Sequence, residues 1–69
     1  MTENFFETRV IETITPALNV GERAEFFANT LFVEGSHVTL AKVILALDKI
    51  GAGKIKVSDV HGEFAIDFI

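Results

Sequence analysis

The sequence contains no cysteine, no tryptophan and no tyrosine, and its single proline is Pro16. Without cysteine the chain has no disulfide, no thiolate ligand for a metal and no thiol nucleophile. The missing disulfides matter because a chain of 69 residues buries only a modest share of its surface on folding. We therefore expect one domain over residues 1–69, with a partner subunit contributing to its stability.

The sequence also lacks a membrane-targeting pattern. No apolar run approaches the roughly 20 residues that a membrane-spanning helix needs. The first nine residues include Glu3 and Glu7 where a signal peptide carries basic residues. These features predict a soluble, cytoplasmic protein without a membrane partner.

Positive charge is scarce. Six lysines and arginines stand against ten acidic residues, which gives a net charge of −4. Phosphate backbones repel that average charge, so nucleic acid is an unfavoured partner. By contrast, hydrophobic residues make up 49% of the chain and include seven phenylalanines. This composition excludes an intrinsically disordered chain.

The most apolar helical pattern covers residues 39–50. Its apolar residues recur at spacings of three and four, which predicts one buried helix face. Ser36 or Thr39 suits the N-cap position, and Gly51 suits the left-handed residue that ends a helix. The apolar face comprises Leu40, Val43, Ile44, Leu47 and Ile50.

A helix is also predicted over residues 3–14, with Thr2 as its N-cap. Phe6, Val10 and Ile14 recur every four residues, and the residue before Pro16 is disfavoured in a helix. The β-branched residues in this segment also have strand propensity. A strand therefore remains an alternative for this first segment.

A further helix is predicted over residues 20–32. Asn19 and Glu22 have the spacing of a capping box, and Gly35 marks the turn that follows. The apolar positions that support this helix are Val20, Ala24, Phe27, Ala28 and Leu31.

The C-terminal residues change to an alternation of period two, which predicts a β-hairpin with His61-Gly62 as its turn. A two-residue loop pairs Val60 with Glu63, and a four-residue loop over residues 59–62 keeps the same apolar face. The register then places three pairs opposite each other, namely Ile55–Phe68, Val57–Ile66 and the oppositely charged Lys56–Asp67.

The expected fold is therefore α+β, with three helices followed by an antiparallel hairpin packed on them. This is the element order of a winged helix, which makes a DNA-binding regulator one alternative function. Its DNA contacts would be Lys42, Lys49, Lys54 and Lys56. Asp48 and Leu45 on the outward side of the predicted recognition helix argue against this alternative.

No motif predicts catalysis, a cofactor or a metal. Gly53-Lys54 lacks the residues of a phosphate-binding loop, and a helix end with a turn explains it. Ser58, Asp59 and His61 are too close together along a hairpin tip to form a triad. His37 and His61 are too few ligands for a structural metal. The sequence predicts a protein that is not an enzyme.

Several large apolar residues are left outside the predicted core. On the helical wheels Phe5, Phe26 and Leu45 fall away from the buried faces. Ile69 ends the last strand, whose backbone groups are free to pair with another chain if that strand is a sheet edge. Clustered exposed apolar residues mark interaction sites. The preferred hypothesis is a self-associating protein-interaction module that uses these four residues. A small virus-encoded inhibitor that occludes a host protein is another alternative.

Overall fold

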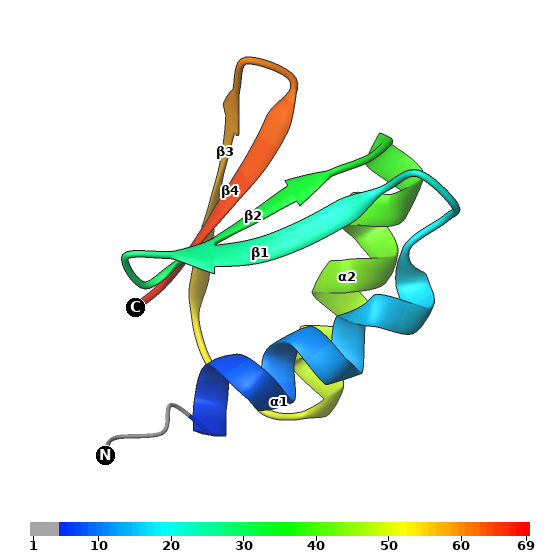
Figure 1. Cartoon of the computed structure of the whole chain (residues 1–69). Helices are drawn as coiled ribbons and strands as arrows, with labels where there is room; N and C mark the ends of the chain where they lie inside the picture. Colours follow the sequence, from blue (N-terminus) through cyan, green and yellow to red (C-terminus); the bar gives the residue numbers. More distant parts are fainter. Residues whose placement is uncertain (1–4) are drawn as a thin grey trace.

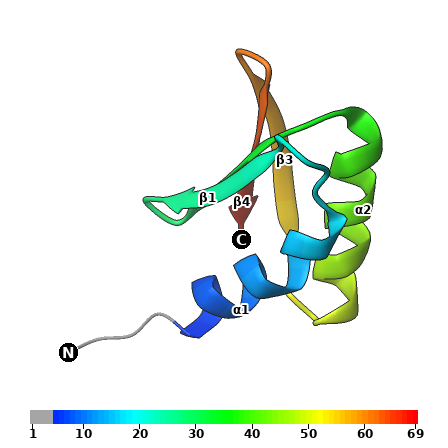
Figure 2. The same cartoon turned by 45° about the vertical axis from the view of Figure 1, so that its right-hand side comes forward.

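The computed structural model describes residues 5–69 and shows two α-helices and a four-stranded antiparallel sheet (Figures 1 and 2). Thr2 and Glu3, predicted at the start of the first helix, lie outside the described residues. The elements follow the chain in the order α1 (Phe5–Ile14), a short 3₁₀ helix η1 (Thr15–Ala17), β1 (Arg23–Phe27), β2 (Thr30–Glu34), α2 (His37–Lys49), β3 (Ile55–Val60) and β4 (Glu63–Phe68).

The helix predicted for residues 39–50 is α2, which begins at His37 and so follows the Ser36 alternative for its N-cap. Ser36 is its N-cap, because its hydroxyl oxygen accepts a 3.2 Å hydrogen bond from the backbone N–H of Thr39. Val43 and Leu47 are buried on its inner face. Gly51 follows the helix with a φ of 69°, as predicted for the residue that ends it.

The first segment is helical in its described part, so the strand alternative is wrong there. Val10 and Ile14 of α1 are buried. Phe6 is only partly covered, and its ring and that of Phe68 lie edge to face with 5.1 Å between their centroids. Pro16 lies in η1, which closes the turn after α1.

The helix predicted over residues 20–32 is wrong, because this segment forms the β1–β2 hairpin. Ala28 and Asn29 both have positive φ, 52° and 68°, and they join Phe27 to Thr30 in a two-residue turn. This hairpin leaves two α-helices in the described chain, so the three-helix, winged-helix-like arrangement is also wrong.

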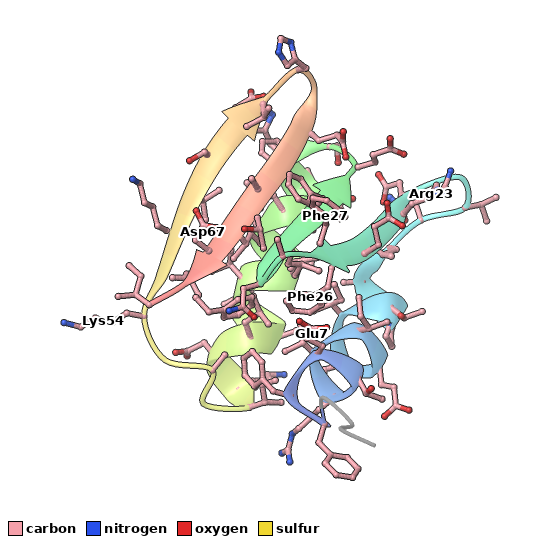
Figure 3. All side chains as sticks on the ribbon, turned by 60° about the vertical axis from the view of Figure 1, so that its left-hand side comes forward. Glu7, Arg23, Phe26, Phe27, Lys54 and Asp67 are labelled. Atoms are coloured by element: carbon pink, nitrogen blue, oxygen red, sulfur yellow. The ribbon has the colours of Figure 1, made fainter. Side chains whose placement is uncertain are left out.

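Three apolar side chains lie in other positions than the predicted helix would give them. Phe26 faces the core side of β1, where its ring stacks on Phe68 at 5.8 Å, so it is not a spare apolar residue. Phe27 projects to the other side of the strand and is exposed (Figure 3). Val20, placed on the predicted helix stripe, is fully exposed before β1.

The C-terminal hairpin has the predicted register. Val60 pairs with Glu63 around His61-Gly62, and Lys56 lies opposite Asp67. The last strand does not meet the condition of lying at a sheet edge, however, because the strand order is β1-β2-β4-β3. β4 pairs on both sides, and β1 and β3 are the edges of the sheet.

Both helices pack on one face of the sheet. The buried core contains residues from α1, α2 and the two central strands, which explains why β2 alternates between the buried Leu31 and Val33 and more exposed side chains. The turn between β3 and β4 extends beyond the helices (Figures 1 and 2). The core residues are Val10, Ile14, Leu31, Val33, Val43, Leu47, Phe64 and Ile66.

Candidate interaction surfaces

Three of the four residues predicted for a partner interface are exposed. Phe5 is 78% exposed, Leu45 64% and Ile69 81%, whereas Phe26 is half-buried on the core side of β1. The exposed three come from the start of α1, the middle of α2 and the residue after β4. Leu45 lines a hollow together with charged neighbours, so the first candidate interaction surface is described around it.

The outward side of α2 carries an alternating apolar and basic line, which we call the α2 stripe. It consists of Val38, Lys42, Leu45 and Lys49, whose spacings of four, three and four residues place them along one side of the helix. All four are exposed. A binding partner would therefore meet apolar side chains flanked by two ammonium groups.

A hollow of about 450 Å³ lies along this stripe, next to α1. Lys42, Leu45 and Lys49 line it together with Thr13, Ala46 and Ile50. Val38 was missed in the sequence because the predicted helix began at residue 39, and only a helix that starts at His37 brings Val38 onto this side.

A second hollow, the α1–β1 hollow, lies on the other side of α1. It has a volume of about 310 Å³ and is lined by Glu7, Thr8, Ile11, Glu12 and Phe26. Figure 3 shows Phe26 on β1 close to Glu7 on α1. Its lining combines apolar groups from Ile11 and Phe26 with carboxylates, so it suits a partly apolar, partly cationic occupant. Periodicity alone could not find it, because β1 was predicted as a helix.

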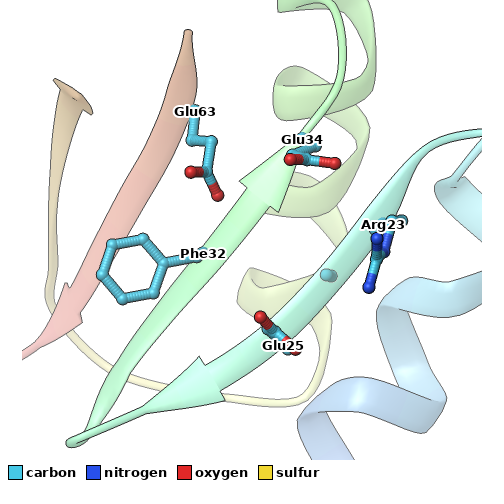
Figure 4. A pocket seen from close by; sticks show the side chains of 6 residues that line it. Arg23, Glu25, Phe32, Glu34 and Glu63 are labelled. Atoms are coloured by element: carbon cyan, nitrogen blue, oxygen red, sulfur yellow. The ribbon is translucent and has the colours of Figure 1, made fainter. Parts of the chain in front are cut away.

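The sheet face opposite the helices forms a third surface. Phe32 lies there between Glu25 on β1 and Ala65 on β4, and a hollow of about 250 Å³ opens beside it. Figure 4 shows Arg23 and three glutamates around this hollow. The exposed Phe27 lies on the same face, opposite Thr30. The glutamates make this face a poor site for phosphate groups.

The lysines predicted as DNA contacts do not gather on one surface. Lys42 and Lys49 belong to the α2 stripe, whereas Lys56 lies on the sheet face opposite the helices, beside Asp67. Lys54 precedes β3, and its backbone carbonyl accepts a 3.0 Å hydrogen bond from the N–H of Ile69. The structure therefore separates the expected recognition-helix lysines from the expected wing lysine Lys56.

The Glu22 side chain, predicted as a member of a capping box, is held by a set of hydrogen bonds just before β1. Its carboxylate accepts hydrogen bonds from the backbone N–H of Asn19 at 2.7 Å, the hydroxyl of Thr39 at 2.7 Å and the backbone N–H of Ser36 at 3.3 Å. The Asn19 bond, followed by the Thr39 bond, holds the pKa of Glu22 below its ordinary value.

This arrangement around Glu22 is structural. The bond between Glu22 and Asn19 is the reciprocal half of the predicted capping box, formed here in a turn instead of at a helix start. Thr39 is buried, and its hydroxyl is satisfied by Glu22. These hydrogen bonds join the segment before β1 to the first turn of α2.

The glycines before Lys54, the residues near the β3–β4 turn and His37 all lie in ordinary structural positions. Gly51 and Gly53 lie in the connection between α2 and β3. Ser58 and Asp59 are consecutive residues of β3, so their side chains point to opposite faces of the sheet. His37 packs against the ring of Phe64 at 5.2 Å. Within residues 5–69, no group of three or more histidine, aspartate or glutamate side chains is placed to hold a metal ion.

Neither of the two helices in the described part of the chain combines the length and apolar content needed to cross a membrane. Comparisons of the chain with protein-family models, with curated proteins and with solved structures found no match. The surfaces described above are therefore the basis for a functional proposal.

Proposed function

We propose that this chain is a protein-interaction module without a catalytic role, and that it self-associates through the α2 stripe. The exposure of Leu45 is the observation that supports this proposal most strongly. Leu45 is 64% exposed on a helix whose opposite face holds Leu47, which is 1% exposed. The fold of a single chain leaves Leu45 in water between two lysines, whereas an interface would cover it.

The energetics favour covering this residue. Transfer of the exposed part of a leucine side chain out of water stabilises a complex by about 1–2 kcal/mol. The neighbouring Val38 adds apolar surface on the same line of α2. For a 69-residue chain without disulfides, that contribution is a substantial fraction of the stability of a small domain.

Pairing through a sheet edge is the weaker route to self-association. The prediction relied on the last strand, which is central in the sheet. The edge strand β3 carries Lys56 and Asp59, and charged side chains on edge strands are a common protection against pairing with another chain. We therefore assign self-association to the helix surface.

The two alternatives have less support. DNA binding would need the four lysines on one surface, and they are divided between α2, the start of β3 and the open sheet face. A virus-encoded inhibitor that occludes a host protein stays a prediction that no feature of residues 5–69 favours over self-association.

Sedimentation equilibrium of the purified chain tests the proposal. We expect the weight-average mass to rise above that of one chain with concentration, and Leu45→Glu to keep the chain monomeric. Val20→Glu is a matched control, because Val20 is also a fully exposed apolar residue and lies outside the stripe. A wild-type chain that stays monomeric up to about 1 mM, where only very weak association escapes detection, would contradict the proposal.

A further inference from the structure

We propose that the α2 stripe of one copy docks into the α1–β1 hollow of a second copy. This inference rests on the proposed self-association and names the surface that receives Leu45. Each chain carries both halves of the contact, on α2 and on the opposite side of α1. The occupant of the hollow is thus a second copy of this chain.

The apolar parts of the two surfaces match. The stripe presents Val38 and Leu45, seven residues apart, which corresponds to about 10.5 Å along a helix. The hollow presents Ile11 and Phe26, both of which also pack against the core and are thereby held in place. An exposed leucine and an apolar hollow that is supported by the core form the usual centre of a protein interface.

The charged parts of the two surfaces are complementary. Lys42 and Lys49 flank Leu45 in the stripe, and Glu12 is an exposed carboxylate at the hollow. Opposite charges at the margin of an interface guide association and reject wrong partners. The same lysines disfavour contact between two α2 stripes, because that arrangement brings ammonium groups together.

The hollow on the open sheet face is a less suitable receptor for the stripe. Its lining already contains the cation Arg23 among the carboxylates (Figure 4), and that cation opposes the approach of Lys42 and Lys49. In the α1–β1 hollow the charged lining residues are Glu7 and Glu12. No cation is among the described residues that line the α1–β1 hollow, so the two lysines meet no such opposing charge there.

The contact joins two different surfaces of the chain. Two copies can therefore form a dimer that contains this contact twice, or successive copies can form a head-to-tail ring or filament. In both cases the same residue pairs meet. A charge exchange between the two surfaces consequently tests the contact whatever the final number of subunits is.

The experiment measures dissociation constants by sedimentation equilibrium for Lys42→Glu, Glu12→Lys and the variant that carries both changes. Each single reversal replaces an attraction by a repulsion, and we expect it to weaken association about tenfold. The double variant restores the opposite charges, and we expect it to regain the wild-type constant within about threefold. Circular dichroism at each concentration verifies that every variant is folded.

Two control variants separate this contact from a general effect of net charge. Lys54→Glu and Glu25→Lys change the charge by the same amounts and lie outside both surfaces. We expect each control to bind within about twofold of the wild type, since a distant exposed charge is largely screened.

The outcomes distinguish the inference from the proposed function. If Leu45→Glu abolishes self-association while Glu12→Lys leaves it unchanged, the stripe uses another receptor surface and the inference is overturned, although the proposed function stands. Single reversals that weaken association without rescue in the double variant also overturn the inference. A wild-type chain that is monomeric throughout removes both.

Discussion

The Thr39 hydroxyl donates a 2.7 Å hydrogen bond to the Glu22 carboxylate, across 17 residues of sequence. Thr39 lies in the first turn of α2, and Glu22 directly precedes β1. The same carboxylate accepts the backbone N–H of Ser36, the N-cap of α2. One side chain therefore fixes the start of the helix that carries the α2 stripe.

Replacement of Glu22 by glutamine is expected to lower stability near neutral pH. The carboxylate accepts bonds from Asn19, Thr39 and Ser36, and an amide is a weaker acceptor that offers one oxygen instead of two. Thermal unfolding followed by circular dichroism measures the loss. Glu25→Gln is the matched control on the outer sheet face, and its effect is expected to be small.

The effect of Glu22→Gln should depend on pH. The pKa of the Glu22 carboxyl lies below its ordinary value of 4.5 in the folded chain, chiefly because of the Asn19 N–H bond. The charged group thus stabilises the fold above pH 4.5, and this contribution is lost as the pH falls through the lowered pKa. The stability difference between the two chains should shrink over that interval. A constant difference from neutral pH down to strongly acidic solution would show that the carboxylate charge is unimportant.

Gly35→Ala is expected to destabilise the chain by about 1–3 kcal/mol, the usual cost of adding atoms to a well-packed site. A Cβ at this position would lie 3.0 Å from Glu22 Oε2 and 3.1 Å from Thr39 Cβ. The added methyl group therefore meets the hydrogen-bonded set around Glu22. Urea denaturation measures the change, and a fully neutral substitution would mean that this segment adjusts freely.

Two leucines on α2 should respond differently to truncation. Leu47→Ala is expected to cost about 2–5 kcal/mol, because it empties part of the buried core. Leu45→Ala should change the stability of the isolated chain by no more than about 0.5 kcal/mol, since this side chain is largely exposed. Denaturation at a concentration where the chain is monomeric makes the comparison. Equal losses would place Leu45 in the core.

Ala28→Gly is expected to stabilise the chain by about 0.5–1 kcal/mol. Ala28 has a φ of 52°, in the left-handed region that side chains with a Cβ disfavour, and glycine removes that penalty despite its larger entropy loss. Ala52→Gly is the control. Ala52 lies outside the left-handed region, so this substitution should destabilise the chain. Destabilisation by both changes would show that the β1–β2 turn does not strain Ala28.

The sequence was sufficient to predict α2 and the C-terminal hairpin. For α2, the apolar period, the Ser36 cap and the terminal Gly51 all agree. For the hairpin, the Lys56–Asp67 pair fits only the register in which the apolar residues also share a face. Where several local signals coincide in this way, one structure satisfies them all.

The β1–β2 hairpin escaped prediction because its residues satisfy two periods. Ala24, Phe27, Ala28 and Leu31 fit a helix, and the same segment alternates as two strands once the turn is placed at Ala28-Asn29. This turn contains no glycine, so it lacks the strongest hairpin signal. Pairing of β2 with β4 joins residues that are 29 (Glu34 and Glu63) to 37 (Thr30 and Asp67) positions apart, and such long-range pairing is invisible to local patterns.

The interaction surface was predicted only in part for the same reason. Leu45 lies on a correctly predicted helix, and its exposed position followed from the helical wheel. Phe26 was assigned from a helix that does not exist, and it instead forms part of the α1–β1 hollow. That hollow depends on β1 lying beside α1, which is a tertiary contact.

The association state of the wild-type chain and of Leu45→Glu, compared by sedimentation equilibrium from about 1 μM to about 1 mM, tests the central claim most directly. We predict a wild-type mass that rises with concentration and a Leu45→Glu mass that stays at one chain. A wild-type chain that remains monomeric over the whole range, or a Leu45→Glu variant that associates as the wild type does, would contradict the role of the α2 stripe.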